Sequence, residues 1–73
     1  MKLRATTILS YGSPKTVACR LELQWEEGSS WLDLGLEHRG EEEWMMLLSL
    51  LVLGARTAGV SFEVVDLRDK VLQ

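Results

Sequence analysis

The chain has 73 residues, a formal net charge of −3 and a sequence pI near 5.0. This length suffices for one hydrophobic core and not for two, so we expect a single domain over residues 1–73. The single cysteine excludes an intramolecular disulfide and argues against a structural zinc site, and the scattered Lys and Arg residues argue against nucleic-acid binding. Self-association then remains the common way to stabilise so small a domain.

The first part of the chain contains two segments with the alternation of β-strands. Residues 3–9 are rich in β-branched side chains, and residues 16–25 give the clearest alternation in the sequence. Between them, residues 11–15 combine Gly, Ser and Pro and predict a tight connection. The positions expected to face the core are Leu3, Ala5, Thr7, Leu9, Val17, Cys19, Leu21, Leu23 and Trp25.

A third strand is predicted over residues 31–36. Residues 26–30 are typical of a hairpin loop, so this strand should pair antiparallel with the one before it. Its leucines alternate with other residues, and we expect all three of them to point inward. They are Leu32, Leu34 and Leu36.

A helix and a last strand follow. Gly40 precedes three glutamates, which are typical of a helix start because carboxylates complement the positive end of the helix dipole. The helix ends at Gly54 or at Gly59, since either glycine suits a left-handed cap. Residues 60–65 alternate again and predict a strand whose core-facing residues are Val60, Phe62 and Val64.

The resulting order, β-β-β-α-β, predicts an α+β fold. We expect a small two-layer sandwich, in which one helix packs on one face of an antiparallel-rich, four-stranded sheet. A right-handed crossover through the helix should leave the third and fourth strands parallel to each other.

The predicted helix is apolar around more of its circumference than a surface helix requires. The residues expected to pack on the sheet recur at helical spacing, and they are Trp44, Leu47, Leu48 and Leu51. A second face is also apolar, and its residues are Met45, Met46, Leu50, Val52 and Leu53. Three coverings are possible for this second face: the C-terminal tail with Val71 and Leu72, a second copy of the chain, or another protein.

We predict that a protein contact forms at Met45, Met46 and Val52 of the helix and at Trp31. Trp31 falls on the strand face opposite to the three leucines of its segment, and exposed tryptophans are frequent interface anchors. A homodimer is the expected partner arrangement, because symmetric dimers are the commonest oligomers.

No residue pattern points to catalysis, and we expect a non-enzymatic protein without cofactor or metal. The only histidine, His38, lies among charged residues and is expected to be a solvated surface residue. Cys19 should be a small buried apolar side chain. The acidic run Glu41–Glu43 is explained as a helix start. An alternative is that these carboxylates share one surface with Glu22, Glu26 and Glu27. Such a surface would suit an acidic inhibitor that occupies the nucleic-acid site of another protein.

Residues 49–64 resemble a known family. Residues 49–55 read Ser-Leu-Leu-Val-Leu-Gly-Ala, and a Gly-containing turn and an alternating strand follow. This segment resembles the second helix and last strand of HPr-like phosphocarriers, in which a short helix starts at Ser and ends in Leu-Gly-Ala. The resemblance implies an open-faced sheet. In that family the phosphorylated histidine follows the first strand in a Leu-His-Ala-Arg-Pro-like motif. Residues 11–14 of this chain read Tyr-Gly-Ser-Pro, so the resemblance implies a relative without phosphocarrier activity.

The longest apolar stretch also bears on location. It runs from Trp44 to Ala55, about 12 residues, which is shorter than the roughly 20 that a membrane-spanning helix needs. The first residues alternate polar and apolar side chains and lack the apolar core of a signal peptide. We therefore expect a cytoplasmic protein that does not bind membranes.

Overall fold

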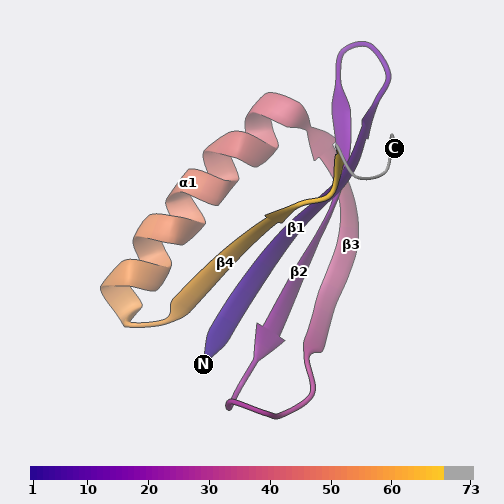
Figure 1. Cartoon of the computed structure of the whole chain (residues 1–73). Coiled ribbons are helices and arrows are strands. Elements are labelled where there is room, and N and C mark those ends of the chain that lie inside the picture. Colours follow the sequence, from indigo (N-terminus) through magenta and orange to yellow (C-terminus); the bar gives the residue numbers. More distant parts are fainter. Residues whose placement is uncertain (69–73) are drawn as a thin grey trace.

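The computed structural model describes residues 1–68, which form a four-stranded sheet with one helix on one face (Figure 1). This arrangement confirms the predicted α+β fold and the order β-β-β-α-β. The elements are β1 (Lys2–Tyr11), β2 (Thr16–Gln24), β3 (Leu32–Gly40), α1 (Glu41–Ala58) and β4 (Ser61–Asp66).

The strands are ordered β3-β2-β1-β4 across the sheet. β2 runs antiparallel to both β1 and β3, as predicted for the hairpin, whereas β1 and β4 are parallel. Lys2 pairs with Gln24 on one side and with Ser61 on the other. The β2–β3 loop and the end of α1 therefore lie at the same end of the sheet.

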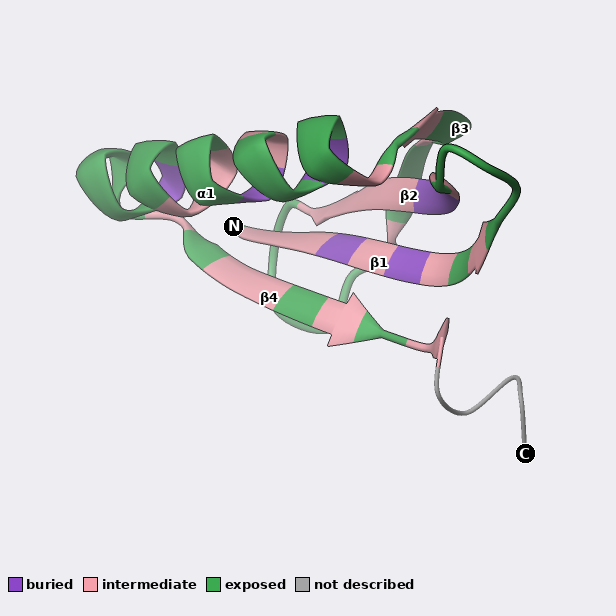
Figure 2. Cartoon of the chain, turned by 90° about the horizontal axis from the view of Figure 1, so that it is seen from above, coloured by how far each residue is buried: buried purple, intermediate pink, exposed green. Residues whose placement is uncertain are grey.

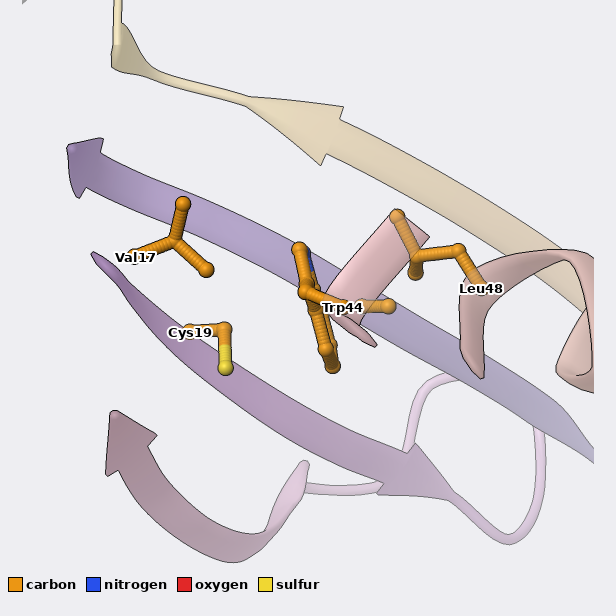
Figure 3. Packing of buried hydrophobic residues seen from close by; sticks show 5 residues of the cluster. Val17, Cys19, Trp44 and Leu48 are labelled. Carbon is orange, nitrogen blue, oxygen red and sulfur yellow. The ribbon is translucent and has the colours of Figure 1, made fainter. Parts of the chain in front are cut away.

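The hydrophobic core lies between α1 and the middle of the sheet. Trp44 projects from the first turn of the helix onto β1 and β2 (Figure 3). Its indole Nε1–H donates a hydrogen bond to Thr7 Oγ1 at 2.7 Å, so the buried indole nitrogen and the buried hydroxyl satisfy each other. The buried core residues are Ala5, Thr7, Val17, Ala18, Cys19, Trp44, Leu48 and Ala55.

The helix begins and ends at glycines. Gly40 precedes its first residue, and three glutamates occupy its first turn as predicted. Gly59 adopts the left-handed conformation with φ 72°, and its N–H caps the last turn, so the helix passes through Gly54 and ends at the later of the two candidates.

The prediction that Leu32, Leu34 and Leu36 point inward is wrong, because these side chains are 59%, 50% and 50% exposed. β3 is an edge strand, and only the start of the helix lies beside it. A register irregularity near Gly35, whose φ is 123°, also interrupts the alternation. Leu34 and Leu36 consequently lie on opposite faces of the sheet.

Three other predicted core positions are also exposed. Trp25 follows the end of β2 and is 66% exposed, so it does not pack in the core or at its rim. An irregularity between Thr7 and Leu9 pairs Leu9 with Ala18 and removes it from the face that α1 covers. Val64 lies on β4 at the other edge of the sheet and is half exposed.

Candidate protein-interaction surfaces

The side of α1 that points away from the sheet is exposed (Figure 2), and it carries large apolar side chains together with the polar Glu42, Ser49 and Thr57. We call Met45, Met46, Leu50 and Leu53 the outward helix face; their exposed fractions are 50%, 69%, 60% and 61%. All four belong to the second apolar face that the sequence indicated, and no described part of the chain covers them. Val52, the fifth predicted residue, is only half-buried and lies at the margin of this surface. Val71 and Leu72, proposed above as a possible cover, lie outside the described residues.

The sheet has its own open face, on the side opposite to α1, and this face is charged. Salt bridges cross it from strand to strand: Arg4 to Glu22 at 3.1 Å, Lys2 to Glu63 at 3.2 Å, and Arg20 to Asp33 at 3.6 Å. A shallow depression of about 430 Å³ runs between Arg4, Arg20 and the end of β4. Water can solvate this face, and its charges are already paired.

Trp31 belongs to the charged face and not to the helix side. The Arg4 guanidinium lies 3.9 Å from the centre of the Trp31 ring, which leaves the indole half-buried. Because the sheet separates Trp31 from Met45, Met46 and Val52, one flat contact cannot include all four. Their role as contact residues stays a prediction, and it now concerns two different faces.

A second apolar surface lies on the helix side of the β2–β3 hairpin, beyond the end of the helix-covered area. We call Leu21, Leu23, Leu32 and Leu34 the hairpin patch; two are half-buried and two are exposed. A crevice of about 60 Å³ separates this patch from α1, and its apolar lining is Cys19, Leu21, Leu34, Trp44 and Leu47. The sequence indicated these leucines as core residues but could not reveal that the helix leaves them uncovered.

His38 lies at the other end of β3 and contacts Tyr11. The Tyr11 hydroxyl and His38 Nδ1 are 2.9 Å apart, and both side chains are exposed. Sequence analysis missed this pair, because the two residues are 27 positions apart and meet only through the pairing of β1, β2 and β3. The turn between β1 and β2, where the HPr-like family carries its histidine motif, contains no helix here.

Cys19 is buried beneath Trp44, as predicted, and is 2% exposed. Burial raises the pKa of its thiol, the nearby carboxylate of Glu37 adds to this, and the Arg39 guanidinium opposes it. The Sγ–H donates a weak hydrogen bond to the Glu37 carbonyl oxygen at 3.5 Å. The thiol is therefore kept protonated and inaccessible, which is the opposite of what a nucleophile requires.

The acidic residues do not share one surface. Glu26 and Glu27 lie in the β2–β3 loop, whereas Glu41–Glu43 begin the helix at the opposite end of the sheet, because Thr16 pairs with Gly40 there. Glu43 accepts a hydrogen bond from Arg39 at 2.8 Å, which together with Glu37 raises the pKa of that guanidinium. The arrangement that an acidic inhibitor would need is therefore not present.

Residues 1–68 contain neither a cluster of metal-ligating side chains nor a membrane-spanning helix. No three His, Cys, Asp or Glu side chains there are close enough together to hold a metal ion. Within the same residues, no helix is both long enough and apolar enough to cross a membrane.

Comparison with known proteins gives no family for this chain. No family model, no curated protein and no solved structure matches it. Its function must therefore be inferred from the exposed surfaces described above.

Proposed function

We propose that this protein is a non-enzymatic interaction module that self-associates through the outward helix face. The observation that carries this proposal is the exposure of Met46, Leu50 and Leu53 along one stripe of α1, with Met45 exposed on its flank. Single exposed apolar residues are normal on a protein surface, whereas a contiguous apolar patch marks a contact site. The contact in this proposal is with a second copy of the chain.

The contrast between the two open faces supports this choice. On the open sheet face, Arg4, Glu22, Arg20 and Asp33 form ion pairs and remain compatible with water. The outward helix face has no such pairs among its own four residues, and the only polar side chain beside them in the middle of the helix is Ser49. Exposure to water is therefore compatible with the ion pairs of the sheet face, whereas it is unfavourable for the apolar side chains of the outward helix face.

The expected affinity follows from the burial that remains to be gained. Full burial of a large aliphatic side chain contributes roughly 1.5–3 kcal/mol, so four that are half exposed or more gain roughly 3–6 kcal/mol per copy. Two copies together gain roughly 6–12 kcal/mol, against an association cost of about 4–15 kcal/mol. The net gain is then at most about 8 kcal/mol, so we expect a reversible dimer whose dissociation constant is micromolar at the tightest, and not an obligate one.

Molar mass measured by light scattering tests the proposal directly. Over protein concentrations from about 1 to about 500 µM, the mass should rise from the monomer value of 8.3 kDa towards twice that value. Leu50→Lys places a charge in the centre of the outward helix face and should keep the protein monomeric over this range.

Leu36→Lys is the matched control for that variant. Leu36 is comparably exposed, but it lies on the open sheet face, so its replacement should leave dimerisation unchanged. Circular dichroism confirms that both variants are folded. A wild-type mass that stays at 8.3 kDa throughout, or equal effects of the two substitutions, would contradict the proposal.

A further inference from the structure

One helix is too narrow to cover this sheet. Four strands at a spacing of about 4.8 Å make a sheet roughly 19 Å wide, whereas a helix with its side chains is about 10–12 Å across. α1 begins next to the last residue of β3 and ends next to the start of β4, so it crosses the sheet from one edge to the other (Figure 1). The diagonal leaves the far end of the β2–β3 hairpin uncovered.

Burial along β2 locates this gap. Val17 and Cys19, at the end where α1 begins, are 0% and 2% exposed. Leu21 and Leu23 continue the same face towards the loop and are only half-buried. Leu32 pairs with Leu23 and is 59% exposed, so the face opens progressively towards the loop.

We infer that the hairpin patch of each copy binds α1 of the other copy. The two helices then lie side by side between two sheets, and each helix packs its inner side on its own sheet and its outward helix face on the hairpin patch of the partner. This inference rests on the proposed self-association, and it identifies the hairpin patch as the surface that binds the helix of the partner copy. One contact of this kind covers both apolar surfaces, whereas pairing of helix against helix alone would leave the hairpin patch in water.

The sizes and shapes of the two surfaces are compatible. Met46, Leu50 and Leu53 recur at the spacing of a single helix stripe, and they span about 10 Å along the axis. The small crevice lined by Leu34 and Leu47 marks the border between α1 and the hairpin patch, beside which the second helix lies in this arrangement. Helix-in-groove contacts of this kind use apolar anchors at i, i+4 and i+7.

The direction of the partner helix is part of this inference. With the two-fold axis running along the helices, the two helices lie side by side and both end at the same end of the dimer. That end also carries the β2–β3 loop, since Ser61 and Glu27 border the same depression. Arg56 in the last helical turn of one copy then approaches Glu26 and Glu27 of the other, a favourable pairing of charges.

A cysteine pairing experiment tests this arrangement. Leu34→Cys and Leu53→Cys are prepared separately and oxidised either alone or as a mixture, and the products are separated by non-reducing electrophoresis. Cys19 is kept, because its 2% exposure prevents it from reacting in the folded protein. We expect a covalent dimer in the mixture and little in either single sample, because only the mixture places one cysteine on the hairpin patch and one on the facing helix.

Leu34→Lys provides an independent measurement. It should weaken dimerisation by roughly tenfold or more, whereas Leu36→Lys on the same strand and the opposite face should not. Efficient disulfide formation by Leu53→Cys alone would overturn this arrangement and would favour a dimer in which the two outward helix faces pack against each other. A dimer unaffected by Leu34→Lys would also overturn it while leaving the proposed function intact, whereas a wild-type protein that never dimerises would refute both.

Discussion

The hydrogen bond from Trp44 to Thr7 joins two buried side chains inside the core, and its removal has a calculable cost. Thr7→Val keeps the shape of the side chain but deletes the acceptor of the 2.7 Å bond, which leaves the indole N–H buried without a partner. An unsatisfied buried donor costs about 1–3 kcal/mol. The free energy of unfolding expected for a domain of 73 residues is about 4–11 kcal/mol. This one substitution should therefore remove a substantial share of that free energy.

Urea unfolding followed by circular dichroism measures this loss. With an m value of about 1–3 kcal/mol per molar urea, the midpoint for Thr7→Val should fall by roughly 1 M. Thr6→Val is the control, because Thr6 borders the depression on the open sheet face and is not part of the core. Trp44→Phe removes the donor, so adding Thr7→Val to it should cost about 1 kcal/mol less than Thr7→Val alone. Strict additivity, or an unchanged midpoint in Thr7→Val, would refute the assigned bond.

Three further perturbations follow from local geometry. Gly54→Ala should stabilise the helix by up to about 1 kcal/mol, because no atom lies within 4 Å of the added methyl group. Gly59→Ala should destabilise the helix by about 1–2 kcal/mol, because Gly59 has a φ of 72°. Thermal melts of both variants check that the two effects have opposite signs. Arg68 lowers the pKa of Asp66 below its ordinary 3.8, so the pair contributes stability above that pH and loses it as the pH falls through the lowered value. Asp66→Asn should therefore cost a few tenths of a kcal/mol in urea titrations at pH 7, and this cost should shrink as the pH falls below 3.8. Cys19 should react with a disulfide reagent only when urea unfolds the chain, and rapid modification of the folded protein would contradict its burial.

The elements of this fold could be predicted from local patterns because each is specified by neighbouring residues. The alternation in residues 16–24 and the glutamates after Gly40 act within one strand or one turn, and the structure places β2 and the start of α1 accordingly. The choice between Gly54 and Gly59 could not be made locally, since both suit a left-handed cap. It depends on where the helix must end so that β4 can pair with β1 in parallel.

The uncovered surfaces could be predicted only in part, for a physical reason. The outward helix face is visible in the sequence, because a helix with apolar residues on all sides cannot bury them all against one sheet. The hairpin patch is not visible, because alternation indicates that Leu32 and Leu34 share a face but not whether another element covers it. Coverage depends on the diagonal path of α1 and on the irregularity at Gly35, and neither has a signature among adjacent residues.

These two surfaces also explain how such a short chain can form a stable fold. Among the described residues, the large side chains at the centre of the core are those of Val17, Trp44 and Leu48, with Cys19 beside them, which is little for a protein without a disulfide. In the proposed dimer, the half-buried leucines of the hairpin and the exposed residues of the helix become the interior of one layer shared by two sheets. The outward helix face of one copy then covers the hairpin patch of the other copy, which its own helix leaves uncovered. In that dimer, the single helix and four-stranded sheet of each copy form one half of a three-layer core, so we predict that dissociation lowers the stability of each copy.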